Sequence, residues 1–252
     1  MPNERLRDAM HRNQLTTADL AATAGVDPKT VERWITQDRI PYPRHRHAIA
    51  TQLGETQSHL WPEALSSTRA AEVAQSELVQ IYPRRAAVPV ELWQRLLTTP
   101  TQQVSILVYA GLFLPEQHPR LISILRERVE AGAKVRILLG DPDSPEVAQR
   151  GAEEGIGNAI SAKIRNVLTW YDKLREVDGV SLGLHSTTLY NSIYQFDDEM
   201  LVNPHVFGFP AAHSPTLHLR RLGSGDLFNL YADSFDRIWS MAKPAWPQRE
   251  AH

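Results

Sequence analysis

Residues 16–35 constrain the fold of this chain more than any other segment, and their sequence is TTADLAATAGVDPKTVERWI. Thr16 or Thr17 can cap the start of a helix, and Asp19 places negative charge in the first turn, where the helix dipole favours it. Gly25 can adopt the positive φ that a sharp turn needs. The segment therefore predicts a short helix to about residue 24, followed by a tight turn.

A second helix follows this turn directly. Asp27 can cap it, and Pro28 occupies its first position, where a missing amide proton costs nothing. Val31, Trp34 and Ile35 follow the spacing of three and four residues that defines a buried stripe on a helix. We therefore expect a helix-turn-helix whose second helix directs its other side chains away from the core.

The outward side chains are of the kinds that contact DNA. Arg and Lys can pair with guanine or phosphate, Thr can donate to phosphate or contact a thymine methyl, and Glu can accept from a cytosine amine or pair with a neighbouring cation. A solvated helix face is the structural alternative. The candidate DNA contacts on and beside the two helices are Thr17, Pro28, Lys29, Thr30, Glu32 and Arg33.

A basic segment, residues 39–47 with sequence RIPYPRHRH, follows the second helix and contains no acidic residue. Arg39, Arg44 and Arg46 can hold phosphates and supply the salt-dependent part of DNA affinity. A solvated proline-rich loop is the alternative interpretation. Residues 1–65 as a whole contain eight Arg and Lys and eight Asp and Glu, so this region carries no formal net charge. Any DNA binding is therefore expected to be local, and weak for a single copy.

Two amphipathic helices, predicted at residues 4–13 and 44–53, flank this motif, and Leu60 and Trp61 can close a small core. With its capped second helix, its AGV turn and the sequence TVERW, the arrangement resembles the lambda-repressor-like (Xre) DNA-binding domain over residues 1–65. The resemblance implies a recognition helix in the major groove of a double-stranded operator. Because one such domain buries little DNA, we also expect a homodimer on two half-sites.

Composition limits the remaining possibilities. A chain of 252 residues leaves room for one further module, and a net charge of −2 predicts no general affinity for polyanions. The absence of cysteine excludes disulfides, thiolate nucleophiles and cysteine-ligated metals. The N-terminus lacks a secretory signal, and no run approaches the ~20 apolar residues that a membrane span needs. We expect a cytoplasmic, nucleoid-associated protein without a cofactor.

Residues 66–80 are predicted to be a linker, and residues 81–252 to form a second domain in which strands and helices alternate. Strands are expected at 104–110, 134–139 and 180–185, and helices at 89–97, 119–131, 145–154 and 160–175. Shorter strands at 190–196, 199–203 and 216–221 precede a final helix at 225–241. This pattern predicts an α/β domain with a mixed sheet, in which neighbouring parallel strands carry antiparallel edge strands.

The succession of a βαβαβ run, a hairpin and a final helix ending in SFDRIW resembles the phospholipase-D-like fold over residues 80–242. It is also similar to C-terminal domains fused to Xre-type regulators in actinomycetes, where the resemblance implies a sensing role. In the phospholipase-D-like family a strand carries a nucleophilic His, a phosphate-binding Lys two residues later, and an Asp five residues after the Lys.

This chain departs from that motif. Counting from Tyr190 gives Tyr190, Ser192 and Asp197, whereas counting from His185 gives His185, Thr187 and Ser192. Neither register keeps the Lys, and a phosphodiester nucleophile without its phosphate-binding cation loses much of its transition-state stabilisation. We therefore expect a catalytically degenerate domain and no enzymatic activity.

Open α/β sheets generally form ligand crevices at the carboxyl ends of their parallel strands. The candidate ligand-binding residues at these ends and in the degenerate motif are Tyr109, Asp141, His185, Tyr190, Asn191, Ser192, Tyr194, Asp197, His205 and Arg220. Structural alternatives exist, since GDPDS is a natural turn containing Asp141, and His185 can be a satisfied core histidine. The spacing of His205, His213 and His218 matches no standard zinc pattern, so no metal is expected.

The hypothesis that follows is a dimeric, sequence-specific transcriptional regulator that binds an operator through its first domain and a small-molecule effector through its second. The alternatives are a phospholipase-D-like phosphodiesterase or nuclease, and a protein-binding adaptor or antitoxin. Hydrolysis of a phosphodiester that is lost on His185→Ala would favour the enzyme. A mobility shift with the DNA upstream of its own gene would separate the regulator from the adaptor.

Overall fold

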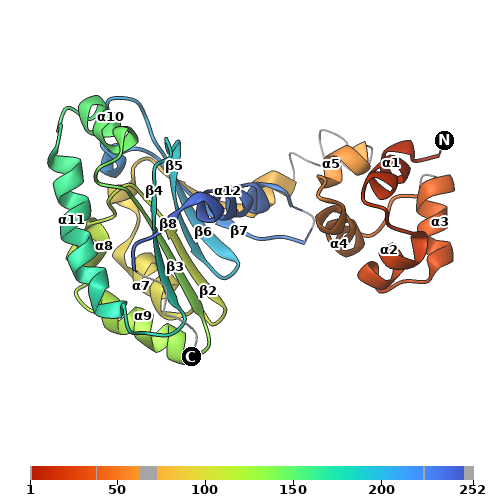
Figure 1. Ribbon diagram of the computed structural model, residues 1–252, viewed down its shortest axis with the longest axis horizontal. Helices are drawn as coiled ribbons and strands as arrows, with labels where there is room; N and C mark the ends of the chain where they lie inside the picture. Colours follow the sequence, from red (N-terminus) through yellow and green to blue (C-terminus); the bar gives the residue numbers. More distant parts are fainter. Residues whose placement is uncertain (1, 38, 63–72, 224, 247–252) are drawn as a thin grey trace. The chain divides into compact units, whose positions relative to one another are not determined.

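The computed structural model describes residues 2–37, 39–62, 73–223 and 225–246. The described residues form two compact units (Figure 1). The first unit lies within residues 1–77 together with the short segment 222–226, and the second lies within residues 78–221 and 227–252. No helix in the described ranges has both the length and the apolar character needed to cross a bilayer.

The first unit is built from short helices around a small apolar core. The fully buried side chains of this core include Leu6, Leu20, Val31, Ile49 and Leu60, and burying each contributes roughly 1.5–3 kcal/mol. The helices are α1 (Glu4–Arg12), α2 (Thr17–Ala24), α3 (Pro28–Thr36), α4 (Pro43–Leu53) and α5 (Gln57–Leu60). All of these except α5, of which only Leu60 was anticipated, were predicted from sequence periodicity to within one or two residues.

The turn between α2 and α3 has the caps that the sequence predicts. The Thr16 hydroxyl accepts from the Asp19 amide, and the Asp19 carboxylate accepts from the Thr16 amide at 2.7 Å, which completes a capping box. Gly25 adopts a φ of +64° at the end of α2. The Asp27 carboxylate accepts from the Lys29 amide at 2.8 Å at the start of α3. The two helices, their caps and the turn between them lie where the sequence predicts.

The second unit contains an eight-stranded mixed sheet with the order β1-β7-β6-β5-β2-β3-β4-β8. Its three central strands β2, β3 and β4 are parallel, and the other neighbours are antiparallel, as the sequence pattern predicts. The strands are β1 (Leu78–Tyr82), β2 (Gln103–Leu107), β3 (Lys134–Gly140), β4 (Val180–His185), β5 (Asn191–Phe196), β6 (Glu199–Pro204), β7 (Thr216–Arg220) and β8 (Lys243–Pro244).

Helices cover both faces of this sheet (Figure 1). One face carries α7 (Val90–Thr98), α8 (Phe113–Gln117), α9 (Leu121–Glu130), α10 (Pro145–Glu153) and α11 (Ala159–Tyr171), and the other carries α12 (Leu227–Met241). On the first face, the ring of Tyr194 packs edge-on against Trp93 and Phe113. On the second face, Arg136 of β3 pairs with Asp236 of α12 at 2.7 Å and covers the Phe235 ring.

Two parts of the predicted second domain differ from the structure. The predicted linker 66–80 is wrong at its end, because Leu78 already begins β1; its earlier part falls on residues 63–72, which lie outside the described residues. β1 is an edge strand with Val79 and Ile81 exposed, so it lacks the burial alternation that identifies a strand. The short α8, which follows β2, was also missed.

Asp197 occupies the turn between β5 and β6 and joins it to the start of β2. It has a φ of +50°, a region that Asp tolerates better than most residues. Its carboxylate accepts from the amides of Thr101, Gln102 and Gln103 at 2.9, 3.0 and 2.8 Å. Because a carboxylate that accepts several amide bonds is strongly held, Asp197 fixes where β2 begins beside β5.

Replacing Asp197 with Ala leaves three amides without their acceptor and places a β-carbon in a left-handed conformation without a compensating bond. We expect the free energy of unfolding to fall by about 1–3 kcal/mol, measured by urea denaturation. Asp233→Ala, an exposed aspartate on α12, is the matched control and should change it by less than about 0.5 kcal/mol. Equal stabilities of the two variants would contradict the assigned role.

Candidate functional site

The exposed face of α3 carries the side chains that were predicted to contact DNA. Lys29, Glu32 and Arg33 are exposed, and none of them forms an ion pair with another described residue. Pro28 is exposed at the first position of the helix, and Thr30 is half-buried beside it. Thr17, at the start of α2, is also half-buried. The exposed face of α3 therefore presents two cations and one anion to solvent.

The basic segment 39–47 is half helical, because α4 begins at Pro43, so the alternative of a proline-rich loop is wrong. Arg39 and Arg44 are exposed, as a phosphate contact requires. Arg46 is only 5 % exposed, so the prediction that this side chain contacts DNA is wrong. Its position explains this burial, since it lies three, four and seven residues before the buried Ile49, Ala50 and Leu53, on the inner face of the helix.

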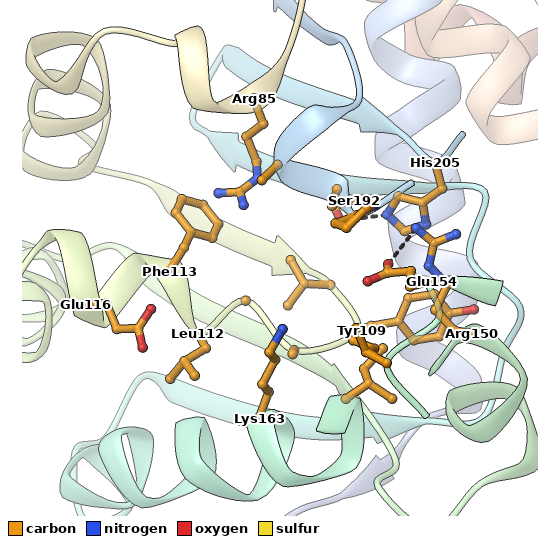
Figure 2. Close-up of a pocket in the computed structure, with 18 of the residues that line it drawn as sticks. Arg85, Tyr109, Leu112, Phe113, Glu116, Arg150, Glu154, Lys163, Ser192 and His205 are labelled. Carbon is orange, nitrogen blue, oxygen red and sulfur yellow. Dashed lines mark hydrogen bonds and ion pairs between the residues drawn. The ribbon is translucent and has the colours of Figure 1, made fainter. Parts of the chain in front are cut away.

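The second unit contains a cavity of about 260 Å³ at the carboxyl end of β2 (Figure 2). Its walls come from the loop that joins β2 to α8, from the first residues of β5, and from α10, α11 and the segment after β6. The polar and charged residues that line it are Arg85, Tyr109, Glu116, Arg150, Glu154, Lys163, Ser192, Tyr194 and His205. The position agrees with the expected place of a ligand crevice in an α/β sheet.

Four of the predicted ligand-binding residues meet in this cavity, namely Tyr109, Ser192, Tyr194 and His205. They come from the end of β2, from β5 and from the segment after β6. Ser192 and Tyr194 point to the same face of β5 because side chains alternate along a strand. The structure thus brings together residues that lie up to 96 positions apart in the sequence.

The other six predicted ligand-binding residues do not line the cavity. Tyr190 is 80 % exposed, and Asn191 begins β5 beside it. The Asp141 carboxylate accepts from the Asp143 amide, which is the turn role that was its structural alternative. Arg220 is exposed near Glu199, and Asp197 binds the start of β2.

His185 is the sixth of these residues and is 1 % exposed at the end of β4. Its Nε2 lies 3.2 Å from the carbonyl of Val108, and its Nδ1 accepts from the amide of Thr187 at 3.4 Å. Burial is the main cause that lowers the pKa of this imidazole. Because both ring nitrogens are bonded to the backbone, His185 fits the structural alternative of a satisfied core histidine.

A hydrogen-bonded chain fixes His205 on the cavity wall (Figure 2). Its Nδ1 lies 3.1 Å from the carbonyl of Leu189, so Nδ1 carries the proton and Nε2 is the acceptor. The hydroxyl of Ser192 therefore donates to Nε2, at 3.0 Å. Burial and then the positive charge of Arg150 lower the pKa of His205 from 6.5 to about 4, so the ring is neutral near pH 7.

Tyr109 forms part of the same wall and packs against His205. Its ring stacks on His205 with centroids 5.7 Å apart, and its hydroxyl accepts from the amide of Leu189 at 2.9 Å. Burial raises the pKa of its phenol above the ordinary value. Leu189 therefore holds both rings, through its carbonyl and its amide, which fixes the shape of this side of the cavity.

The charged side chains of the cavity divide into a paired and an unpaired set. Arg150 binds Glu154 at 2.7 Å and the carbonyl of Phe209 at 3.0 Å, so its charge is largely balanced. Arg85 and Lys163 form no ion pair with any described residue. Both are directed toward the open space in Figure 2, from opposite sides.

Sequence reasoning missed Arg85, Arg150 and Lys163. Arg150 follows Val147 by three residues on α10, within the buried stripe, whereas Lys163 is exposed beside the buried stripe of α11. A cation within an apolar helical stripe was therefore a usable signal for Arg150. Arg85 begins a 3-10 helix of only three residues, Arg85–Ala87, which is too short to give a periodic signal.

Comparisons of sequence found nothing similar, since no family model and no curated protein sequence matches the chain. Comparisons of structure found distant likenesses. TrmBL2, an archaeal chromatin protein, matches at 14% identity and a TM-score of 0.41, over 91% of this chain and 87% of its own. The phospholipase D family member Nuc from Salmonella typhimurium matches at 12% identity and a TM-score of 0.38, over 67% of this chain and 97% of its own.

A third structure, phosphatidylserine synthase from Haemophilus influenzae Rd KW20, matches at 13% identity and a TM-score of 0.43. The match covers 95% of this chain and 54% of the synthase. These likenesses are too distant to transfer an activity or the role of any residue. The chemistry of the site therefore has to be argued from its own side chains.

Neither register of the motif that the sequence resembles brings its His and Lys together in the cavity. Counting from Tyr190, Ser192 and the exposed Tyr190 stand where the motif has Lys and His; counting from His185, that His lies outside the cavity lining and Thr187 stands where the motif has Lys. No cluster of three metal-ligating side chains occurs among the residues that the structure describes. What the cavity offers is a neutral His–Ser wall facing two cations, an arrangement suited to binding.

The neutral state of His205 predicts a dependence of stability on pH. The unfolded chain binds a proton at this His near pH 6.5, whereas the folded chain does so only near pH 4. The contribution of His205 to the free energy of unfolding should thus be fully present above pH 6.5. It should decrease by on the order of 2–3 kcal/mol as the pH falls toward 4. His205→Asn should lessen the decrease measured by urea unfolding between pH 7 and 5; an unchanged decrease would contradict it.

Proposed function

We propose that this chain is a sequence-specific DNA-binding transcriptional regulator, dimeric on DNA, whose second unit binds a small-molecule effector. The observation that carries the DNA-binding part is the α2–turn–α3 arrangement with an exposed, unpaired Lys29 and Arg33 on α3. Helices presented in this way enter the major groove in helix-turn-helix proteins, and free cations supply contacts to phosphate and guanine.

Dimerisation is proposed because the Arg and Lys of residues 1–65 are matched by an equal number of Asp and Glu. Lys29 and Arg33 share their face with Glu32, and the buried Arg46 adds no exposed cation. A single copy would therefore make few phosphate contacts and bind weakly. Two copies on half-sites about 34 Å apart would combine these weak contacts into a usable affinity.

The effector site that we propose is the cavity lined by Tyr109, Ser192, Tyr194 and His205. An effector changes DNA affinity only if it binds two arrangements of the dimer unequally. The proposed role is binding without turnover, because in either register the Lys of the resembling family's motif is replaced, by Ser192 or by Thr187.

Replacing Arg33 with Ala should weaken binding to a labelled duplex from the region upstream of the gene. We expect a loss of roughly 5- to 100-fold, the effect of removing one guanine or phosphate contact, measured by fluorescence anisotropy. If Arg33 contacts phosphate, the slope of log affinity against log salt should also decrease by about 1.

The matched control for this measurement is Arg7→Ala, which removes the same charge from the exposed face of α1, where Arg7 pairs with Glu4. This variant should bind the duplex as the unmodified chain does. An equal loss for Arg7→Ala and Arg33→Ala would indicate general electrostatic attraction. No binding of the unmodified chain to any upstream duplex would favour the protein-binding adaptor.

The absence of turnover is tested with bis(p-nitrophenyl) phosphate, a generic phosphodiester. We expect no release of nitrophenol above background at high protein concentration, because no described side chain of the cavity combines a free nucleophile with a phosphate-binding partner in the required spacing. Hydrolysis that persists through purification and disappears in His205→Asn would restore the enzyme hypothesis.

A further inference from the structure

Arg85 is a cation held over the cavity without an anionic partner. Its guanidinium lies over the ring of Phe113, with Cζ 3.5 Å from the ring centroid. Its Nε is buried and has no hydrogen-bond partner among the described residues. Because an unsatisfied donor on a charged group is costly to bury, an acceptor bound beside this guanidinium would stabilise it.

The opposite wall contributes a second unpaired cation. Lys163 extends from α11 toward the same space, across from Arg85 (Figure 2). Of the two acidic residues in the lining, Glu154 is bound to Arg150, and Glu116 is exposed on α8 and pairs with neither cation. Burial also lowers the pKa of Arg85, which is the electrostatic sign of an uncompensated positive charge.

The volume of the cavity limits the size of what it can hold. About 260 Å³ corresponds to roughly nine water molecules at ~30 Å³ each, and lies just below the range of about 300–1,000 Å³ for sites of drug-sized ligands. A ligand held wholly within this volume is smaller than a dinucleotide or a folded peptide. It fits one charged group attached to a single ring or a short chain.

The walls between the two cations are largely apolar. These walls are lined by Leu112, Phe113, Ile156 and Ile160. The ring of Phe113 also packs edge-on against the rings of Trp93 and Tyr194. An anion with no apolar part would leave the lining side chains facing water. A flat apolar group would bury them, at roughly 25 cal/mol per Å² of apolar surface.

From this geometry we infer that the cavity binds a small organic anion, a carboxylate or phosphate attached to one ring-sized apolar group, with the anion between Arg85 and Lys163. This inference rests on the proposed effector site and names its ligand class. Arg85 can bind either group in a two-pronged manner, because its planar guanidinium matches both geometries, and Lys163 adds a point charge. The apolar group lies against Phe113 and the two isoleucines.

The test is isothermal titration calorimetry of the full chain with three probes of similar size. Benzoate and phenyl phosphate carry the anion, and benzamide keeps the ring and the shape of benzoate without the charge. We expect benzoate, phenyl phosphate or both to bind at least tenfold more tightly than benzamide. Binding of benzoate alone would assign a carboxylate, and binding of phenyl phosphate alone would assign a phosphate. Equal affinity for all three probes, or no binding of any, would overturn the inference.

Variants locate the binding. Arg85→Met should reduce affinity for the tighter anion at least tenfold, and Lys163→Met at least threefold, with little effect on benzamide. The matched control is Arg84→Met, because Arg84 is exposed next to Arg85 and does not line the cavity. Since Lys163 is exposed, its substitution tests the inference even if Arg85→Met fails to fold. Equal losses for the anion and benzamide would overturn the inference.

The same samples separate this inference from the regulator hypothesis. DNA binding measured without any probe tests the regulator alone. If the chain binds its upstream duplex and none of the anions, the regulator hypothesis is retained and the inference of an anionic ligand is rejected. If the chain binds benzoate through Arg85 but binds no DNA, the inference of an anionic ligand is retained and the proposed DNA-binding function of the first unit is rejected.

Discussion

The carboxylate of Asp197 holds the start of β2 against the end of β5, and the geometry of the second unit depends on this contact. With β2 beginning at Gln103, the antiparallel pairing aligns Val104 with Phe196. That register places Ser192 beyond the end of β2, next to the loop that carries Tyr109. It also directs the Ser192 side chain to the face of the sheet that α10 and α11 cover. A slip of one residue would direct Ser192 to the α12 face and remove the cavity wall.

The first unit could be predicted almost completely from sequence because its signals are local. A cap, a left-handed Gly25 and the Pro28 at a helix start each act within a few residues, so the sequence neighbours that create them are also the spatial neighbours. Arg46 is instructive, because its charge suggested a surface contact while its helical position placed it inside. Where residue type and periodicity disagreed, periodicity was the better guide.

The cavity could be predicted only in part. The end of β2 and the face of β5 follow from strand alternation, which is why Ser192 and Tyr194 were found. Arg85 comes from a three-residue 3-10 helix, too short to show a periodic pattern, and only the folded chain shows that it faces Lys163 across the cavity. Asp197 shares its sequence neighbourhood with Ser192, yet the two lie at opposite ends of β5, since five residues of extended chain span about 17 Å.

The fixed tautomer of His205 gives the cavity a direction. Because the Ser192 proton is directed to Nε2, Ser192 presents lone pairs to the cavity, whereas Arg85 and Lys163 present only donors. The lining therefore accepts a hydrogen bond at Ser192 and donates from the two cations on opposite sides of the space. A ligand with a hydroxyl or amine at the position that faces Ser192 would gain a hydrogen bond there that its positional isomers lack.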